Sequence, residues 1–105
     1  MSVLELAFSP KANEQLVALY EYIAEAASPD IAQNFTEAIV SHCENFLNFA
    51  EVGVRRDDIR PNLRLTHFRG RTIIAFTVTE KQVVILGVFY GGQHYEAALR
   101  QNLFE

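Results

Sequence analysis

The sequence has almost no cysteine and no segment suited to a membrane. Its 105 residues include one cysteine, Cys43, which excludes an intramolecular disulfide, and no cysteine and histidine residues have the spacing of zinc ligands. The longest apolar run, Val83–Tyr90 with its one glycine, is far shorter than the about 20 residues that a spanning helix needs. Met1–Pro10 lacks the basic and apolar segments of a signal peptide. We therefore expect a cytoplasmic protein with a reduced thiol, no metal or other cofactor, and no membrane partner.

Motifs of catalysis are also absent. The sequence contains no paired carboxylates, no nucleophile beside a base and no phosphate-binding loop at a recognised spacing. Gly91-Gly92 follows a predicted strand but lacks the third glycine of a dinucleotide-binding fingerprint. Apart from the arginines, the residues suited to acid–base work are His67, Tyr90, His94, Tyr95 and Glu96.

Charge is unevenly divided along the chain. The net charge is −4, but residues 1–54 hold eight acidic side chains against the single cation Lys11, whereas residues 55–105 hold eight basic and five acidic side chains. Six of the basic side chains are arginines between Arg55 and Arg71. The overall sign argues against general nucleic-acid binding, while the basic segment suits an acidic partner or an RNA backbone.

Three antiparallel strands are predicted over residues 63–68, 72–79 and 83–90. Arg69-Gly70 supplies the first turn, because glycine readily adopts a positive φ. Glu80-Lys81-Gln82 supplies the second, as a polar break between two apolar β-branched runs. The length and the apolar content of 50% favour one globular domain spanning residues 1–105, able to bury roughly 65% of its unfolded surface.

The last of these strands is apolar on both faces. Strict alternation gives one face Val83, Ile85 and Phe89, and the other face Val84, Leu86, Val88 and Tyr90. A strand of this kind is covered on both sides. We therefore expect helices of the chain to cover one face and a partner to cover the other.

The first half of the chain predicts a strand and a helical hairpin. Val3–Phe8 alternates as a short strand. Ser9-Pro10 and Ser28-Pro29 each supply an N-cap and a first helical residue, and Pro29 ends the first helix near Ala27. The second apolar stripe runs from Ile31 to Phe49 at intervals of three and four. Only a residue or two join the helices, so they pack as an antiparallel pair.

Further elements follow from local signals. His42 lies on or beside the second stripe, where a partly buried, hydrogen-bonded core histidine is favoured over a catalytic role. The irregular connection Ala50–Asn62 has a turn at Gly53, and Asn62 tolerates a left-handed backbone. Tyr95–Phe104 forms a short C-terminal helix. The sequence therefore predicts an α+β fold with an N-terminal strand, an αα-hairpin packed on a three-stranded antiparallel meander, and a short C-terminal helix.

Two functional interpretations of the polar residues remain open. RNA cleavage by attack of a 2′-hydroxyl needs a base, an acid and positive charge at the phosphate; Arg64, Arg69, His94 and Glu96 are candidates for these roles. Arg60, Arg64, Arg69 and Arg71 are expected to cluster around one end of the meander. The arginines of the meander are equally compatible with a solvated sheet face or with partner binding. His94 and Tyr95 are equally compatible with a functional role and with a purely structural role as the hinge into the last helix.

Several segments in the same order resemble the RelE/ParE superfamily of bacterial toxins from type II toxin–antitoxin systems, and the ParE branch best. The segments are Tyr22-Ile23-Ala24-Glu25, Pro29-Asp30-Ile31-Ala32, Gly53-Val54-Arg55, Arg60-Pro61-Asn62-Leu63-Arg64, Ile74-Ala75-Phe76 and Val84-Ile85-Leu86-Gly87-Val88-Phe89-Tyr90-Gly91. Two positions depart from the family pattern, because Gly87 stands where arginine is common and Asn62 stands where glycine is common.

The resemblance implies a growth-inhibiting, non-enzymatic poison of DNA gyrase that an acidic antitoxin, folding on binding, neutralises in a hetero-oligomer. It implies no sequence-specific binding of nucleic acid. The residues expected to bind the antitoxin or the target are Arg60, Arg64, Arg69, Arg71, Val84, Leu86, Val88, Tyr90, Gln93, His94 and Tyr95.

Two alternatives remain. One is a ribosome-dependent mRNA endonuclease of RelE type, whose catalytic residues would be Arg64, Arg69, Tyr90 and His94. The other is a non-toxic dimerisation or interaction module. Only Tyr90 suits proton transfer at the end of the last strand, and the net charge is negative, so the ParE interpretation is favoured.

Overall fold

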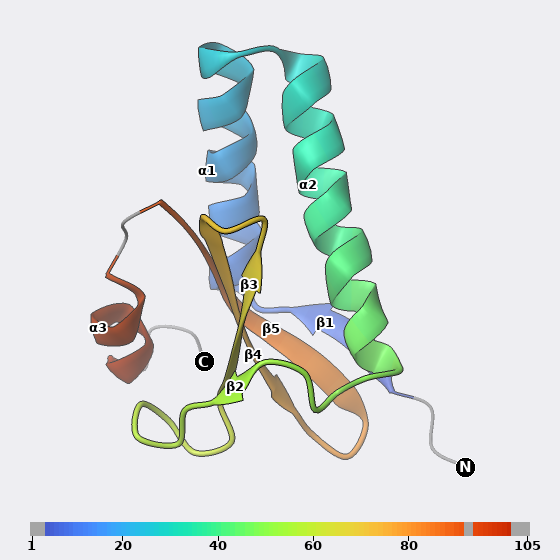
Figure 1. Cartoon of the computed structure of the whole chain (residues 1–105), viewed down its shortest axis with the longest axis vertical. Helices are drawn as coiled ribbons and strands as arrows, with labels where there is room; N and C mark the ends of the chain where they lie inside the picture. Colours follow the sequence, from blue (N-terminus) through green and yellow to red (C-terminus); the bar gives the residue numbers. More distant parts are fainter. Residues whose placement is uncertain (1–3, 92–93, 102–105) are drawn as a thin grey trace.

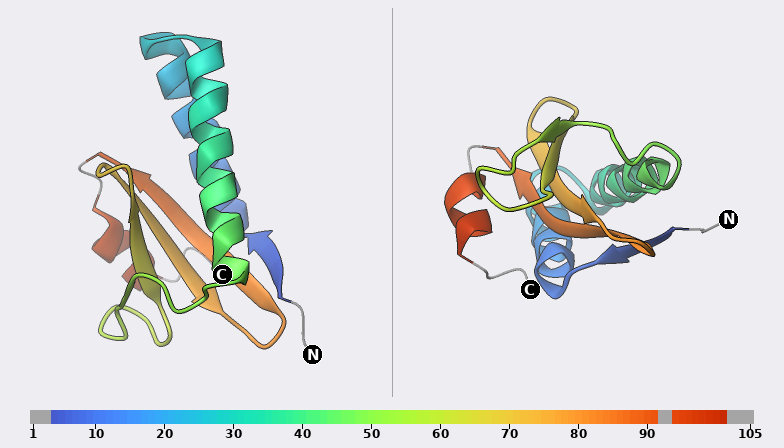
Figure 2. Two further views of the ribbon diagram at one scale, coloured as in Figure 1. Left: turned by 45° about the vertical axis from the view of Figure 1, so that its right-hand side comes forward. Right: turned by 90° about the horizontal axis from the view of Figure 1, so that it is seen from below.

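The computed structural model describes residues 4–91 and 94–101. Its elements in chain order are β1 (Glu5–Phe8), α1 (Pro10–Ala26), α2 (Pro29–Glu44), the 3-10 turn η1 (Asn45–Leu47), β2 (Val54–Arg55), β3 (Arg64–Phe68), β4 (Thr72–Val78), β5 (Gln82–Tyr90) and α3 (Tyr95–Arg100). The helices α1 and α2 form a hairpin against one face of the sheet, and α3 lies on the other side (Figure 1, Figure 2). The predicted α+β class is therefore confirmed.

The strands form one mixed sheet of order β1-β5-β4-β3-β2. The three strands β3, β4 and β5 form the predicted antiparallel meander. The N-terminal strand joins it in parallel at β5, with Leu6 opposite Val83. Val54–Arg55 adds a short edge strand on β3, where the sequence had predicted only an irregular connection, because two residues are too few to show an alternating pattern.

The starts of both helices are confirmed by their caps. The Ser9 and Ser28 hydroxyl oxygens accept hydrogen bonds from the Ala12 and Ile31 amides, each at 3.1 Å. The second stripe is shorter than predicted, since Phe49 lies beyond η1 with 67% of its surface exposed. Within the described residues, α3 ends at Arg100; the predicted continuation to Phe104 lies outside them. None of the helices in residues 4–91 and 94–101 combines the length and the apolar character required to cross a membrane.

A β-bulge in β5 changes which side chains face the helices. Phe76 of β4 is opposite Ile85, but the preceding Ala75 is opposite Gly87, so Leu86 is an extra residue on β5. Val88 consequently packs with the helix-facing core, and Phe89 packs on the other side. The predicted face of Val84, Leu86, Val88 and Tyr90 is therefore wrong beyond Leu86, because one inserted residue inverts the alternation.

Two side chains, one from the N-cap of α1 and one from α1 itself, form hydrogen bonds with backbone groups around the bulge. The Ser9 hydroxyl donates to the Leu86 carbonyl oxygen at 3.1 Å, and the Gln15 Oε1 accepts from the Val88 amide at 2.8 Å. A Cβ on Gly87 would lie 2.6 Å from the Phe89 ring and 3.3 Å from the Gln15 Oε1. A larger residue at this position therefore does not fit this arrangement unless the Phe89 ring moves.

Each sheet face has its own apolar core. The helix-facing core combines α1, α2 and η1 with β4 and β5, and its largest fully buried members are Phe46, Phe76, Ile39, Ile74 and Ile85. The smaller core on the opposite face combines the sheet with the loop before β3 and with α3, and consists of Ile59, Leu63, Leu65, Ala75, Leu86, Phe89 and Leu99. The chain itself therefore covers both faces of β5.

Candidate partner-binding surfaces

The four arginines predicted to form one cluster lie at two ends of the sheet. Arg64 begins β3, whereas Arg69 and Arg71 lie in the turn after Phe68. Arg64 and Phe68 are four positions apart along β3, which is about 13 Å at about 3.3 Å per residue. The guanidinium of Arg64 donates to the Glu51 carbonyl oxygen at 3.0 Å. The prediction of a single cluster is therefore wrong, because β3 is long enough to hold its two ends apart.

The guanidinium groups of the β3–β4 turn lie over aromatic rings. Cζ of Arg69 is 5.0 Å from the centre of the Phe68 ring and 5.8 Å from that of Phe35. Cζ of Arg71 is 5.8 Å from the centre of the Tyr90 ring. Within the described residues neither guanidinium pairs with a carboxylate. Both charges are consequently positioned by cation–π contacts and remain available to an acidic partner.

A row of aromatic rings connects α1 and α2 to this turn. The centre of the Tyr90 ring is 6.1 Å from that of Tyr22 on α1 and 6.1 Å from that of Phe35 on α2. The Phe35 and Phe68 rings follow at 5.7 Å. Tyr22 and Phe35 were not predicted as site residues. Phe35 lies on the second apolar stripe and was visible in the sequence as a packing residue. Tyr22 is 59% exposed, and no periodic pattern singled it out.

A groove of about 410 Å³ lies between α1 and the second half of β5. Its walls include Gln15, Ala18 and Tyr22 of α1, together with Arg71 and Tyr90. Gln15 was also missed by the sequence analysis, although it is a polar residue one helical turn from the buried Ala12 and Leu19. The groove therefore gathers three predicted site residues, Arg71, Val88 and Tyr90, with residues of α1 that were not predicted to belong to a site.

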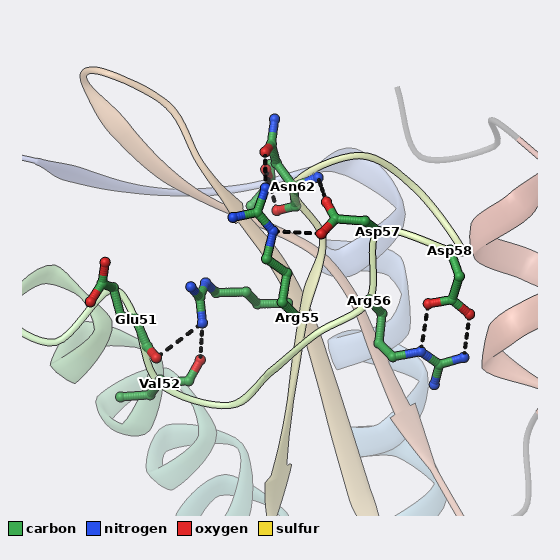
Figure 3. Close-up of polar contacts among 9 residues, drawn as sticks. Glu51, Val52, Arg55, Arg56, Asp57, Asp58 and Asn62 are labelled. Carbon is green, nitrogen blue, oxygen red and sulfur yellow. Dashed lines mark hydrogen bonds and ion pairs between the residues drawn. The ribbon is translucent and has the colours of Figure 1, made fainter.

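The connection before β3 is organised by its own charges (Figure 3). Arg55 Nε donates to the Asp57 carboxylate at 2.6 Å, and its Nη2 donates to the Asn62 Oδ1 at 2.8 Å. The Asn62 amide donates to Asp57 at 2.8 Å, with φ of +65° at Asn62 as predicted. These hydrogen bonds, from the Asn62 amide first and Arg55 second, lower the pKa of Asp57. The loop is therefore pre-formed, and Arg55 is not a free cation.

A second set of ion pairs connects this loop to α3. Arg56 contacts Asp58 through Nε and Nη2, both at 2.9 Å, and reaches Glu96 of α3 at 3.6 Å. Arg100 of α3 lies 3.9 Å from Asp58 and 3.5 Å from Glu96. The hydrogen bonds from Arg56 lower the pKa of Asp58. We call Arg56, Asp58, Glu96 and Arg100 the α3 clamp.

Of the second face predicted for β5, Val84 and Leu86 lie on the side that α3 covers, whereas Val88 and Tyr90 face the helix pair. Leu99 is fully buried beside Leu86 in the smaller core, and the Tyr95 ring lies 6.1 Å from that of Phe89. Val84 is half-buried and packs against the same core. Leu86 and Val88 are 9% and 3% exposed. In this arrangement a partner reaches Leu86 only if α3 moves away.

The four residues of the endonuclease alternative do not form one constellation. Arg64 lies at the far end of β3, and the Tyr90 ring packs toward the helices. His94 is exposed at the start of α3. Gln93, the remaining predicted binding residue of this region, lies outside the described residues. Arg60 is half-buried in the loop before β3, with its amide donating to the Arg56 carbonyl oxygen at 3.3 Å.

Two further candidates for chemistry are part of the core. His42 is half-buried and its ring contacts those of Phe46 and Phe68, but its Nε2 has no hydrogen-bond partner within the described residues. Burial raises the pKa of the Cys43 thiol to about 12, so the thiol stays protonated and is not a nucleophile. Within residues 4–91 and 94–101 no histidine, cysteine and carboxylate side chains gather as metal ligands.

Comparisons with known proteins identify the family. A family model described as "ParE toxin of type II toxin-antitoxin system, parDE" matches residues 6–95. Among solved structures the chain is similar to one described as "Chromosomal ParDE TA system from P. aeruginosa", at 23% sequence identity and a TM-score of 0.74, covering 85% of this chain and 97% of that one. No curated protein matches. The structural likeness shows a shared fold, and the family model spans most of the chain, so this protein belongs to the ParE toxin family of type II toxin–antitoxin systems.

Proposed function

We propose that this protein stops bacterial growth by inhibiting DNA gyrase and that a cognate antitoxin neutralises it. The match of the ParE toxin family to residues 6–95 carries the proposal. The solved structure that resembles this chain is described as a ParDE system, which supports an antitoxin as the partner. We expect the two proteins to form a hetero-oligomer in the cytoplasm.

Charge and apolar surface support an acidic antitoxin. Arg69 and Arg71 lie on the same turn, over rings of the aromatic row, and neither has a carboxylate partner within the described residues. Tyr22, whose ring centre lies 6.1 Å from that of Tyr90, exposes 59% of its surface. A segment that folds on binding gains from apolar contacts and charge-assisted hydrogen bonds of this kind.

The arrangement of polar groups supports a non-enzymatic mode of action. A general acid or base must lie within hydrogen-bond reach of the reacting atoms, but Arg64 is about four strand residues from the turn that carries Arg69. Arg64 is also engaged with the backbone of Glu51 and Val52. An endonuclease of RelE type is therefore the weaker alternative.

Expression in bacteria separates these functions. For a gyrase inhibitor we expect double-strand DNA breaks and filamentation with intact transcripts, inhibition of supercoiling by purified gyrase, and rescue of growth by a small acidic protein encoded next to this gene. Tyr90→Phe should keep most of the toxicity, because the ring still packs.

Two other outcomes would identify the alternatives. Transcripts cut within the ribosome, and loss of this cleavage in Tyr90→Phe, would instead identify an mRNA endonuclease. Normal growth at full expression of folded protein would favour a non-toxic interaction module.

A further inference from the structure

The sheet has two edges, and only one of them is protected against pairing with another chain. At the protected edge β2 has two residues, and Arg55 within it is held by Asp57 and Asn62. Short edge strands and edge charges are common devices against such pairing. At the other edge β1 runs for four residues, Glu5–Phe8, of which only Glu5 is charged. The β1 edge therefore lacks both devices.

The main-chain groups on the outer side of β1 are open. The amides of Glu5 and Ser9, at either end of this segment, donate to carbonyl oxygens on the β5 side, both at 2.9 Å. Because main-chain groups alternate between the two sides of a strand, those of Leu6 and Phe8 point away from β5. Among the described residues no strand pairs with β1 on that outer side (Figure 1, Figure 2). Leu6 and Phe8 therefore each offer a donor and an acceptor to a further strand.

We propose that a second copy of this chain pairs with β1, in antiparallel register about a two-fold axis at Leu6. Leu6 then lies opposite Leu6 of the second copy, and Leu4 lies opposite Phe8. In this register the open donors and acceptors of the two strands face one another. The two sheets become one, with both helix pairs on the same side of it. Because the same patch is used on both copies, the assembly closes as a dimer.

The side chains of β1 fit the same register. Leu4, Leu6 and Phe8 are half-buried and pack against the helix-facing core, so the pairs Leu6–Leu6 and Leu4–Phe8 continue this core from one copy into the other. On the opposite side of the strand, Glu5 lies across from Ala7 of the second copy, so like charges are not directly opposed. One strand of four residues makes a smaller contact than the roughly 1,600 Å² of a stable complex. We therefore expect a dimer that dissociates on dilution.

The dimer surface is separate from the surface assigned to an antitoxin. β1 pairs with the first half of β5, as far as Ile85. The turn that carries Arg69 and Arg71 lies at the other end of β5, where Thr72 is opposite Tyr90. The inference therefore depends neither on gyrase nor on an antitoxin, and a hetero-oligomer can contain the toxin dimer.

A concentration series on the unmodified protein tests the pairing. Sedimentation velocity between about 5 and 500 µM covers the affinities of weak contacts and should show a monomer converting to a dimer. Over the same range the amides of Leu6 and Phe8 should gain protection from hydrogen exchange, whereas the Ala7 amide, which points toward β5, should be equally protected throughout. A monomer at every concentration, or a dimer in which the Leu6 and Phe8 amides stay unprotected, overturns the proposal.

Charge variants test the register. Ala7→Glu places a carboxylate opposite Glu5 of the second copy, and Ala7→Lys places an ammonium group there, at the same half-buried position. Because the two-fold axis repeats each pair, the dissociation constant of the dimer should be at least tenfold higher in Ala7→Glu than in Ala7→Lys. Adding Glu5→Lys to Ala7→Glu should restore the affinity of Ala7→Lys to within about threefold, since opposite charges again face each other. Equal constants in the two single variants contradict the proposal.

The protected edge supplies the control. Val54→Glu makes the same change in net charge as Ala7→Glu at an exposed position of β2, and should leave the dissociation constant of the dimer within about twofold. Equal weakening by Val54→Glu and Ala7→Glu would reduce the effect to net charge and contradict the proposal. If the neighbouring small protein protects the Leu6 and Phe8 amides while the toxin alone stays monomeric, the edge belongs to that partner and a second copy is excluded.

Discussion

The helix pair and α3 cover opposite faces of the same sheet, but different interactions hold them there. The helix pair contributes a continuous apolar core in which the Phe46 ring stacks on that of Phe76 at 4.4 Å. Ser9 and Gln15 add hydrogen bonds to β5 in surroundings that are buried or partly buried. α3 instead contributes one fully buried side chain, Leu99, and the ion pairs of the α3 clamp.

This difference predicts unequal resistance to opening. Partly exposed ion pairs contribute roughly 0–1 kcal/mol each, whereas each large side chain in a close-packed core contributes several times more. A segment with few buried contacts opens at a lower free energy than the core. We therefore expect the helix face to open only on global unfolding and the α3 face to open locally, exposing Leu86 and Phe89.

The largest effect is expected from the helix-facing core. Phe46 is 1% exposed, so Phe46→Ala should lower the free energy of unfolding by about 3–5 kcal/mol through lost burial and a residual cavity. Urea denaturation measures this change. Phe49→Ala makes the same substitution three residues later at an exposed position and should change stability by less than about 0.5 kcal/mol. Equal losses would mean that Phe49 is buried in solution.

The next effect concerns the attachment of α1 to β5. Ser9→Ala removes an N-cap, worth about 1 kcal/mol, and also removes the donor to the Leu86 carbonyl oxygen, for a total of about 2–3 kcal/mol. Ser28→Ala removes an equivalent cap without a contact to the sheet, and should cost only about 1 kcal/mol. Thermal or urea unfolding measures both losses. Equal losses of stability in Ser9→Ala and Ser28→Ala would show that the hydrogen bond to the Leu86 carbonyl oxygen contributes nothing.

The sequence predicted the features that depend on neighbouring residues. Both Ser-Pro pairs cap their helices, Gly70 has φ of +77° in the first turn, and Asn62 has φ of +65°. Each signal is contained within a few residues, so the chain's distant parts do not alter it. The meander and the helical hairpin follow from such signals together.

The features that were missed depend on residues far apart in the chain. The bulge at Leu86 is stabilised by Ser9 and Gln15, which are 77 and 73 residues away from their partners. Neither contact is visible in the alternation of β5, so Val88 and Tyr90 were assigned to the wrong face. The separation of Arg64 from Arg69, in contrast, follows from strand length alone. It was available from the sequence once β3 had been assigned.

A smaller effect is expected at Leu99. Although this residue is fully buried, Leu99→Ala should lower the global free energy of unfolding by only about 1–2 kcal/mol, because α3 can open without the rest of the chain. Hydrogen exchange should accelerate at the amides of Ala98, Leu99 and Arg100, while the amides of β4 stay protected. Ile39→Ala, at an equally buried position on α2, should cost about 2–5 kcal/mol and accelerate exchange throughout. Uniform acceleration in both variants would contradict local opening of α3.

The smallest effect is the pH dependence of the α3 clamp. Hydrogen bonds from Arg56 lower the pKa of Asp58 beneath its usual value of about 4. A carboxyl group with a lower pKa in the folded chain stabilises that state above its unfolded pKa, and this contribution is lost as the pH falls through the folded value. The NMR signals of the Leu99 methyl groups should therefore stay constant between about pH 7 and 5. Below about pH 4 they should shift, before those of Ile39 do.

Asp58→Asn should perturb the Leu99 signals already at pH 7 and reduce their change on acidification, because the Arg56–Asp58 and Arg100–Asp58 pairs are then absent. Simultaneous shifts of Leu99 and Ile39 at every pH would indicate that α3 opens only when the whole domain unfolds.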